Sequence, residues 1–548
     1  IEFFHGRAFR KALIHQTSVK DTHRGYLRRN AVAFARAMEQ VKRKSVTVGT
    51  HYMSGREVFV RIPFQDFLAH HVIQGRSGSG KSRYAEFFIL QILQFFPDVG
   101  ICLVDGKSEL FARVRLWIAA LLARMNDKDR ERFLDRVIFI DPFDSSMIPP
   151  LNFCAPIPGY PTELLAEDLL GGLRRLFAES QLTVRMEVLL RNTLLAFVEA
   201  GSNGKNLSLL EVKDFLHDEA FRARVLLQVR NEEVRAYCIR DFPQESRGTT
   251  AAVKSRLSFL LLSEQLRLGF GALDSVQFRD GLVNGKIILV NLGKSLFATD
   301  IGRQTVGVLL LSAFVRGVFS RPMNHGPYIM TFCDEFQNFV MPGLFERLYT
   351  EARSYRCFVT AICQQLTAQI APRSLRDILL NNSRYMSLFS SNEEDARPLG
   401  RVMFRPTGYL PKPRRLFSNQ SEHQFYTESE ELERFIRSVP SLKRQHCYFW
   451  DKENHLGAQK ITTCTVPEPH EFVGMKEDEF LRFVEELEPL WKRMGAKRDD
   501  AKKVIKERRA YWGIGQSTPK TLLAPRSRKA LLARLEAHLA KEEKKKDE

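Results

Sequence analysis

The chain has 548 residues, which at about 150 residues per domain suggests roughly three to four domains. Hydrophobic residues make up 44% of the chain and charged residues 27%, a balance that is typical of folded globular proteins and excludes a disordered or fibrous one. The 83 lysines and arginines outnumber the 64 aspartates and glutamates, and the net charge of +19 favours an anionic partner, either nucleic acid or a negatively charged membrane surface. A basic protein with neither partner is the alternative.

The eight cysteines are scattered, with no CxxC pair and no histidine at metal-ligand spacing, so they do not indicate a disulfide scaffold. Several lie in apolar runs, where cysteine behaves as a small buried hydrophobe, and this favours a reducing, cytoplasmic setting. No apolar run reaches the roughly 18–20 residues of a membrane span. The best candidate, Thr305–Val315, is closed by Arg316 and predicts a core helix. Because the chain begins at Ile1 and not at Met, we expect a preceding segment, which could have carried a signal or a membrane anchor.

Residues 1–66 are expected to form an N-terminal segment that ends in a short β-hairpin around Gly55. Strands and helices then alternate between residues 70 and 141. Apolar strands end near Gln74, at Asp105 and at Asp141, and helical spacing runs from Ser82 to Phe96. Strands that are apolar throughout and alternate with helices imply a parallel sheet that is covered on both faces. The pattern therefore predicts an α/β fold with a central, mostly parallel sheet.

Residues 161–274 differ, because they carry long helical patterns and few strand runs, and they predict an all-α insertion domain. Strands resume after this block, at Lys286–Leu292, Tyr328–Glu335, Cys357–Cys363 and Tyr385–Ser390. The α/β domain is therefore expected to be discontinuous, comprising residues 67–160 and 275–470. Residues 471–548 form a charged helical C-terminal extension, which is either a solvated tail or a docking site for partners.

The strongest motif is GxxxxGK[ST], which matches at every fixed position and lies between a predicted strand and a predicted helix. Its residues are Gly75, Arg76, Ser77, Gly78, Ser79, Gly80, Lys81 and Ser82. Glycines let the backbone N–H groups curl around phosphates, and the N-terminus of the helix favours anions. Lys81 is predicted to bridge the β- and γ-phosphates, and Ser82 to ligate Mg²⁺. The motif therefore predicts a site for ATP with Mg²⁺.

A P-loop needs an acidic residue at the end of a nearby strand to hold the metal ion, and three strands end in aspartate, namely Asp105, Asp141 and Asp334. Only Asp334 is followed directly by a glutamate, Glu335. We predict that Asp334 orients the metal and that Glu335 polarises the attacking water as a general base. Asp105 is the alternative metal ligand. The Asp-Glu pair could also simply begin a helix, where acidic residues are favoured.

A pair of glutamines and a pair of arginines are further candidate site residues, because of their positions next to a predicted strand. Gln364 and Gln365 follow the strand Cys357–Cys363, where an amide beside the P-loop can report the γ-phosphate, and Gln365 is predicted as this sensor unless it is a helix cap or a surface residue. Arg353 and Arg356 precede that strand and are candidate arginine fingers for a neighbouring subunit's nucleotide, with surface arginines as the alternative. The adjacent pair at residues 70 and 71 consists of histidines without carboxylate or cysteine partners, and we expect them to be packed and not catalytic.

Taken in order, these motifs resemble those of the type IV secretion coupling proteins, the TraD/TraG-like motors of conjugative DNA transfer within the FtsK/HerA group of RecA-like ATPases. Besides the P-loop and the Asp-Glu pair, the resemblance rests on Val104–Leu110, Ile140–Phe153, Gln365–Ile370 and Leu379–Gly400. It covers about residues 45–450, and the helical block falls where that family inserts its all-α domain. The resemblance implies a RecA-like P-loop nucleotide-binding domain with an all-α inserted domain and a helical C-terminal tail. The chain departs from the family pattern at Ser108, where the family has glycine.

The resemblance also implies how such a protein works. It implies a homohexamer that binds ATP between subunits and pulls DNA, single-stranded and without sequence preference, through a basic channel. Its implied partners are a relaxase, relaxosome or effector-adaptor protein and the components of a type IV secretion channel. Its implied location is the cytoplasmic face of the bacterial inner membrane, reached through segments absent from this chain.

Two other functions stay open at this point. One is a HerA/FtsK-type ATPase that pumps duplex DNA. The other is a recruitment platform, in which the helical insertion and the charged tail bind partner proteins and ATP is mainly a structural ligand. Hydrolysis that rises with DNA and depends on Glu335 would distinguish a motor from such a platform.

Overall fold

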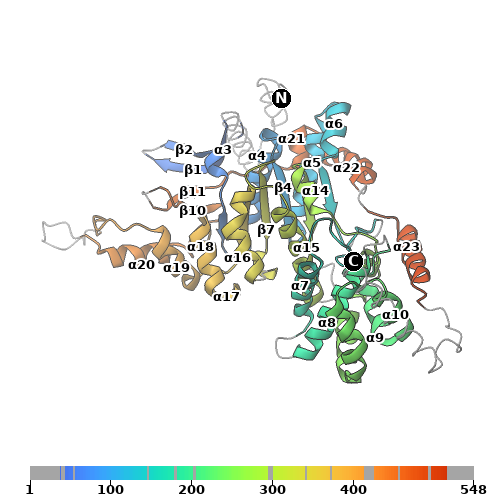
Figure 1. Cartoon of the computed structure of the whole chain (residues 1–548). Coiled ribbons are helices and arrows are strands. Elements are labelled where there is room, and N and C mark those ends of the chain that lie inside the picture. The colour runs from blue at the N-terminus through green and yellow to red at the C-terminus, as the bar shows by residue number, and fades with distance from the viewer. Residues whose placement is uncertain are drawn as a thin grey trace, which may run out of the picture. The chain divides into compact units, whose positions relative to one another are not determined.

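The computed structural model of the chain (Figure 1) describes residue 38 and residues 44–53, 56–142, 144, 147–177, 182–201, 205–293, 300–339, 342–370, 373–412, 425–454, 457–491 and 495–514. The chain divides into two compact units. One consists of residues 1–141 and 277–494 and contains the sheet. The other consists of residues 142–276 and 495–548, and its described regular elements are helices, apart from isolated bridges.

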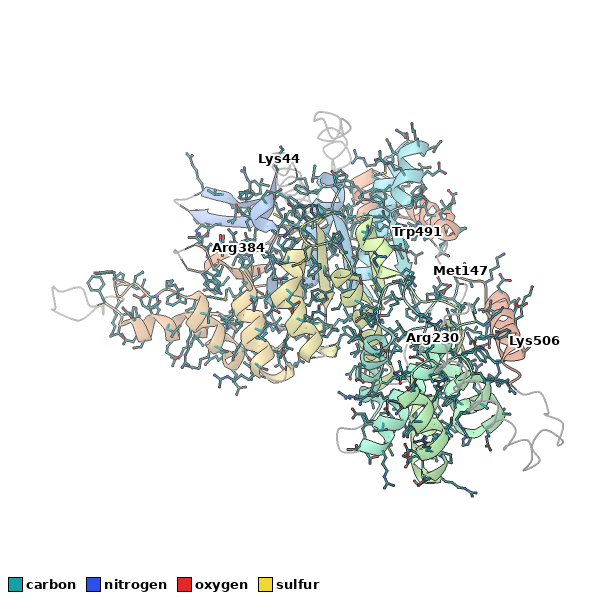
Figure 2. The ribbon with its side chains drawn as sticks, viewed as in Figure 1. Lys44, Met147, Arg230, Arg384, Trp491 and Lys506 are labelled. Carbon is teal, nitrogen blue, oxygen red and sulfur yellow. The ribbon has the colours of Figure 1, made fainter. Side chains whose placement is uncertain are left out.

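These units differ from the expected division in two places. The expected α/β segment runs to residue 160, but the first unit ends at Asp141. The expected C-terminal extension begins at residue 471, yet only residues from 495 onward leave the first unit. The reason lies in packing. The helix Glu477–Trp491 (α22) places Trp491, labelled in Figure 2, in a stack on Phe139 of the sheet with 5.3 Å between ring centroids.

The first unit is built on a mixed sheet with the strand order β2-β1-β11-β10-β9-β3-β8-β7-β4-β6-β5. The strands are β1 (Ser45–Met53), β2 (Arg56–Pro63), β3 (His71–Gln74), β4 (Gly100–Asp105), β5 (Val137–Ile140), β6 (Ile287–Asn291), β7 (Ile329–Asp334), β8 (Cys357–Cys363), β9 (Tyr385–Leu388), β10 (His446–Asp451) and β11 (Gln459–Thr462). The strands from β9 through β5 run parallel, and the others are antiparallel. The predicted α/β fold with a mostly parallel central sheet is therefore confirmed, as is each apolar strand predicted between residues 70 and 390.

The predicted hairpin is also present, but it does not stand apart from the main sheet. β1 pairs with β11 through Thr50 and Thr462, and β11 pairs with β10, which pairs with β9. Sequence reasoning missed β10 and β11. These two strands extend the parallel sheet by an antiparallel edge and so attach the N-terminal hairpin to it.

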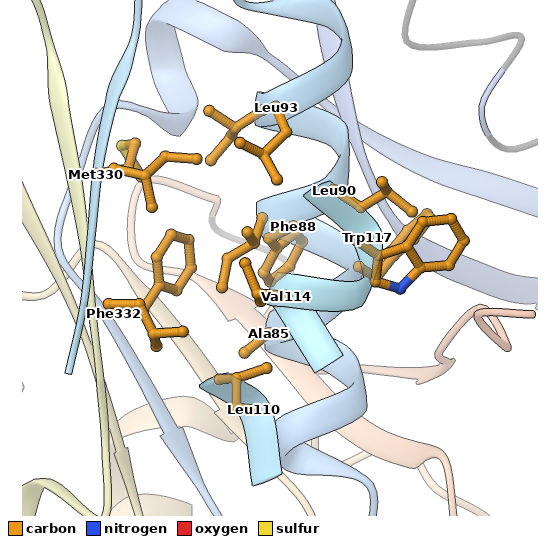
Figure 3. Packing of buried hydrophobic residues seen from close by; sticks show 14 of the residues in the cluster. Ala85, Phe88, Leu90, Leu93, Leu110, Val114, Trp117, Met330 and Phe332 are labelled. Atoms are coloured by element: carbon orange, nitrogen blue, oxygen red, sulfur yellow. The ribbon is translucent and has the colours of Figure 1, made fainter. Parts of the chain in front are cut away.

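Helices cover both faces of the sheet, because the buried strands alternate their side chains between the two faces. On one face, α4 (Lys81–Phe95) and α5 (Glu109–Ala123) pack on β7. Figure 3 shows this packing with Ala85, Phe88, Leu90 and Leu93 of α4, Leu110, Val114 and Trp117 of α5, and Met330 and Phe332 of β7. On the other face, Gly281 of α14 (Phe278–Val283) approaches Ile288 so closely that an added Cβ would lie 2.9 Å from its side chain.

The remaining helices of this unit connect and flank the strands. They are α3 (Phe64–Phe67), α6 (Asp127–Leu134), α15 (Asp300–Phe319), α16 (Pro342–Glu351), α17 (Leu366–Gln369), α18 (Arg373–Asn382), α19 (Glu393–Met403), α20 (Glu428–Ser438) and α21 (Pro469–Val473), with 3-10 turns η8 (Phe336–Asn338) and η9 (Ala352–Tyr355). α15 is long and apolar enough to cross a membrane by composition, but 89% of its apolar window is buried inside the fold. It is a core helix, as the sequence predicts. The eight cysteines are buried.

The regular elements described in the second unit are helices, several of which have polar N-caps. They are α7 (Thr162–Leu173), α8 (Val184–Ala200), α9 (Val212–His217), α10 (Glu219–Leu226), α11 (Glu232–Ala236), α12 (Arg247–Leu260), α13 (Glu264–Phe270) and α23 (Arg498–Tyr511), with the turns η2 (Arg174–Leu176), η4 (Leu209–Glu211), η5 (Tyr237–Asp241) and η6 (Phe242–Gln244). Thr183, Ser246 and Ser263 each accept a backbone N–H of the helix that follows, which satisfies a donor that would otherwise be unpaired. Between residues 162 and 270, the regular elements of the described residues are all helical, and the insertion domain itself stays a prediction.

Candidate nucleotide-binding site

The P-loop connects the end of β3 to the start of α4 and wraps the N-terminus of that helix. Gly78 has φ 76° and Gly80 has φ 112°, in the left-handed region where a side chain would be strained. These two conformations let successive N–H groups turn toward one point, which is the geometry that cradles a phosphate. The predicted loop is therefore present in the predicted context of strand, turn and helix.

Lys81 is the first residue of α4, and its side chain is buried. Its ammonium donates hydrogen bonds to the carbonyl oxygens of Gly75 and Arg76, the latter at 3.0 Å, and so lies inside the loop. Burial lowers the pKa of Lys81, while the carboxylate of Asp334 acts in the opposite direction. The lysine is thus held where an anion bound by the loop would be in reach.

The Ser82 hydroxyl and the Asp334 carboxylate meet across the gap between α4 and β7. Ser82 Oγ donates to Asp334 Oδ2 at 3.1 Å. Asp334 is 2% exposed, and burial, followed by the charges of Asp105 and Glu335, raises its pKa to about 7. A buried carboxylate beside a hydroxyl oxygen is a donor set that suits Mg²⁺, a hard cation that prefers oxygen ligands. The residues present therefore fit the predicted metal.

Asp105 lies next to this pair, because β4 and β7 are neighbours and their register places Asp105 opposite Asp334. Both oxygens of the Asp105 carboxylate are already engaged. One accepts the N–H of Lys107 at 2.7 Å, and the other accepts the N–H of Phe111 at 2.8 Å. These bonds tie Asp105 to the backbone of the turn between β4 and α5, whereas Asp334 reaches the Ser82 hydroxyl of the P-loop, so Asp334 is the better candidate for the metal.

Glu335 follows Asp334 in a left-handed conformation with φ 54°, which is unusual for a residue with a side chain. The residue is 5% exposed, and its carboxylate contacts three side chains. It forms an ion pair with the ammonium of Lys107, accepts Nε2 of Gln337 at 2.5 Å and accepts Nε2 of Gln364 at 2.8 Å. Burial raises the pKa of the Glu335 carboxyl, but the hydrogen bonds from Lys107 and Gln364 outweigh it, so the pKa lies below its ordinary value. The side chain is thus a carboxylate, as a general base requires.

The glutamine that reaches Glu335 is Gln364 and not Gln365, the predicted sensor. Gln365 instead uses its backbone N–H to donate to Oε1 of Gln369, at 3.2 Å, at the start of α17. Since neighbouring side chains at the end of a strand point to opposite sides, only one of the two amides can face the site. The sequence analysis also did not single out Lys107 as a site residue. The available signal was its position two residues after Asp105, at the carboxyl end of a buried strand, where the functional side chains of parallel sheets gather.

Arg353 lies in η9, which precedes β8, whereas the P-loop follows β3. Because β3 and β8 are parallel neighbours, Arg353 and the P-loop lie at opposite edges of the sheet, roughly 20 Å apart along seven residues of β8. The structure therefore does not bring Arg353 to the P-loop of its own chain. A role at a neighbouring subunit's nucleotide stays a prediction, for Arg353 and equally for Arg356.

The two histidines before the P-loop are buried, as expected. Nδ1 of His70 accepts the N–H of Val359 at 2.9 Å, and Nε2 of His71 lies 2.9 Å from the hydroxyl of Ser387. Burial lowers the pKa of His70 to about 4 and that of His71 to about 3, so both rings are neutral near pH 7. They pack inside the sheet and do not contact the P-loop side chains described above.

No family model matches the sequence, and no curated protein matches it. Among solved structures, the plasmid coupling protein TrwB in complex with ADP and Mg²⁺ is 11% identical, with a TM-score of 0.50 over 78% of this chain and 93% of that one. The conjugative coupling protein TrwBΔN70 in its unbound form is 12% identical, with a TM-score of 0.49 over 79% of this chain and 93% of that one. VirB4 of Thermoanaerobacter pseudethanolicus is 15% identical, with a TM-score of 0.48 over 78% of this chain and 98% of that one. Over most of its length, the chain therefore shares the RecA-like α/β fold of the coupling protein TrwB.

Proposed function

We propose that this protein is a P-loop ATPase that couples ATP hydrolysis to DNA translocation and passes a nucleoprotein or protein substrate to a type IV secretion machine. One observation carries the proposal. Three groups meet where the parallel strands have their carboxyl ends. They are the P-loop, the Ser82–Asp334 pair and the buried Glu335, whose carboxylate contacts three side chains. Nucleotide hydrolysis needs each of these groups, and no simpler binding role needs all of them.

ATP would be held by the backbone N–H groups of the loop and by Lys81, and Mg²⁺ by Ser82 and Asp334. The bound metal would neutralise charge on the phosphates. The fold of TrwB supports this assignment, since that protein has been seen in complex with ADP and Mg²⁺. Glu335 would take a proton from the attacking water, and its low pKa keeps it ready to accept one.

Lys107 and Gln364 would set the position of Glu335. Together with Gln337, they bind the Glu335 carboxylate through three contacts. These contacts would fix the orientation of the carboxylate although the backbone of Glu335 is strained. Gln364 directly follows β8 and Lys107 lies in the turn after β4, so the general base is held from the ends of both strands that flank β7. In this arrangement, Gln364 would be the residue that senses the γ-phosphate.

DNA as the substrate is supported by the net charge of +19, because contacts to phosphates that ignore sequence require lysine and arginine. The homohexamer, the single-stranded form of the DNA, the relaxase or effector-adaptor partners and the location at the inner membrane follow from the resemblance to coupling proteins. They are part of the proposal and rest on the order and spacing of the motifs.

The test is the steady-state rate of ATP hydrolysis with Mg²⁺, measured without DNA, with single-stranded DNA and with duplex DNA. Wild type is compared with Glu335→Gln, and Glu351→Gln, an exposed glutamate on α16, is the matched control. We expect DNA to stimulate turnover in wild type and in the control, and Glu335→Gln to abolish turnover while retaining nucleotide binding. Turnover that an assembled ring shows equally with and without DNA would contradict the motor. Stronger stimulation by duplex than by single strands would favour a chromosomal type of pump.

A further inference from the structure

The helical unit contains a groove of about 560 Å³ that the nucleotide site does not use. It lies between the C-terminal end of α12, helix α13 and helix α23. Leucines and isoleucines form its base, among them Leu210, Leu257, Leu268 and Ile505. Its wall toward the C-terminus of the chain is α23, on which Lys506 is labelled in Figure 2.

The walls of this groove are fixed by ion pairs. Arg508 of α23 is fully buried against Glu211 at 3.1 Å, and the next residue, Arg509, binds Asp214 at 2.8 Å. At the other end of α23, Lys502 binds Glu264 of α13 at 3.2 Å. A groove with such walls exists before any ligand arrives, so little ordering is needed on binding.

The groove opens onto apolar side chains that are exposed to water. Leu262, which lines the groove just after α12, is 66% exposed, and Phe259, near the C-terminal end of α12, is 52% exposed. Exposed apolar side chains are therefore present both in the groove and at the end of α12. A groove with an apolar base and an exposed leucine in its lining marks a binding site more often than a single exposed leucine on a flat surface does.

The rim of the groove is positively charged. Lys213, Lys254 and Arg267 line it, and none of them forms an ion pair with another described residue. Among the described lining residues, Glu264 is the acidic one, and Arg498 and Lys502 already neutralise it. A ligand with apolar groups and surrounding carboxylates would satisfy both the base and the rim.

We propose that this groove binds an acidic amphipathic helix of a partner protein. Apolar residues at i, i+3, i+4 and i+7 would enter the base, and flanking glutamates or aspartates would meet Lys213, Lys254 and Arg267. Nucleic acid fits poorly, because the leucine and isoleucine side chains at the base of the groove offer no hydrogen-bond donors to its phosphates. A small apolar ligand would leave the charges of Lys213, Lys254 and Arg267 without partners. The proposal concerns a surface of the helical unit and does not depend on ATP hydrolysis.

The experiment measures fluorescence anisotropy of the full chain with a labelled helical peptide of about 18 residues, which has leucine at that helical spacing and glutamate elsewhere. We expect binding that weakens with added salt, because opposite charges on a surface are screened. The double variant Lys254→Glu/Arg267→Glu should weaken binding by roughly tenfold or more, and Leu262→Ser by a similar factor. All three substituted side chains are exposed, so the fold should be retained.

Matched controls use the same unit. Arg230→Glu and Leu227→Ser replace exposed residues outside the groove and should leave peptide affinity unchanged. Hydrogen exchange with bound peptide should show added protection in α12, α13 and α23. Nucleotide binding is measured on the same samples, so loss of peptide binding with intact nucleotide binding would count against this proposal alone.

Three results would overturn the proposal. The first is no binding of the peptide, and the second is equal affinity for wild type and the groove variants. The third is equal binding of a peptide with lysine in place of glutamate. Vesicles of phosphatidylcholine with about 30% phosphatidylserine are tested in parallel. Binding of these vesicles, lost in the groove variants, without binding of the acidic peptide would identify a membrane-facing surface instead.

Discussion

Arg508 and Glu211 form an ion pair of 3.1 Å in which both side chains are completely buried, although 297 positions separate them in the chain. The same guanidinium donates to the carbonyl of Gly271 at 2.7 Å, so it joins three segments of the helical unit. A charge that has lost its hydration is stable only while its partners remain in place. Helix α23 is therefore a structural part of the helical unit and not a free tail.

This burial predicts the effect of Arg508→Ala. Removal of the arginine leaves the Glu211 carboxylate buried without its counter-charge, which should lower the free energy of unfolding of the helical unit by about 3–5 kcal/mol. The neighbouring Arg509→Ala removes a partly exposed pair with Asp214 and should cost about 0–1 kcal/mol. Hydrogen exchange in α13 at increasing urea measures both values. Equal effects of the two substitutions would contradict the structural role of Arg508.

Lys107 predicts a second outcome, because its ion pair with Glu335 should fix the position of the general base. Lys107→Met should lower kcat for ATP hydrolysis by about tenfold to a hundredfold, since a misplacement of about 1 Å can have that effect. Nucleotide affinity should change by less than about threefold, because the P-loop contacts to the phosphates are retained. Stopped-flow binding of a fluorescent ATP analogue, with kcat measured in parallel, separates the two effects.

The control for this prediction is Lys128→Met, an exposed lysine on α6 in the same unit. It should leave kcat and affinity unchanged. A Lys107→Met protein that loses nucleotide affinity and keeps its kcat would show that the lysine binds phosphate and does not position Glu335.

The sequence predicted the parallel sheet well for a physical reason. Its strands are buried on both faces, so each is a continuous apolar run, as in the segment that ends at Asp105. β10 and β11 escaped notice because they lie toward the antiparallel edge and mix polar with apolar residues, as in Gln459–Thr462. Lys81, Ser82, Asp334 and Glu335 belong to motifs with fixed spacing. Lys107 and Gln364 belong to no such motif. They reach Glu335 because β4, β7 and β8 are neighbours in the sheet, and strand order cannot be predicted from local sequence.

The choice between two adjacent glutamines gives a third prediction. Gln364→Ala removes the 2.8 Å hydrogen bond to Glu335 and should reduce kcat by about tenfold or more. Gln365→Ala removes a side chain that is not bonded to Glu335 and should change kcat by less than about twofold. The two variants differ by one position in the same segment, so each controls for the other. A larger loss of activity in Gln365→Ala would restore the original assignment and would contradict the geometry at Glu335.

The two buried histidines predict how stability depends on pH. Burial lowers the pKa of His70 to about 4 and that of His71 to about 3, from an ordinary value of 6.5. Below pH 6.5, the two histidine rings therefore bind protons in the unfolded chain but stay neutral in the folded chain. The stability that these two neutral histidines contribute should be fully present above pH 6.5 and should be lost as the pH drops toward about 4, by up to about 1.4 kcal/mol per pH unit for each histidine.

Urea unfolding of the sheet-containing unit between pH 7.5 and pH 5 tests this sign, with intrinsic fluorescence of Trp117 and its neighbours as the signal. The slope of the unfolding free energy against pH should be less positive in His71→Asn. The reason is that the unfolded chain then binds one proton fewer in excess of the folded chain. His325→Asn, which replaces an exposed histidine of the same unit, should keep the wild-type slope. The variant is judged by its slope and not by its stability at pH 7, since loss of the contact with Ser387 lowers stability at every pH without changing how many protons are taken up. An unchanged slope in His71→Asn would show that this ring is protonated in the folded state, which its position between β8 and β9 beside Phe88 and Tyr385 should prevent.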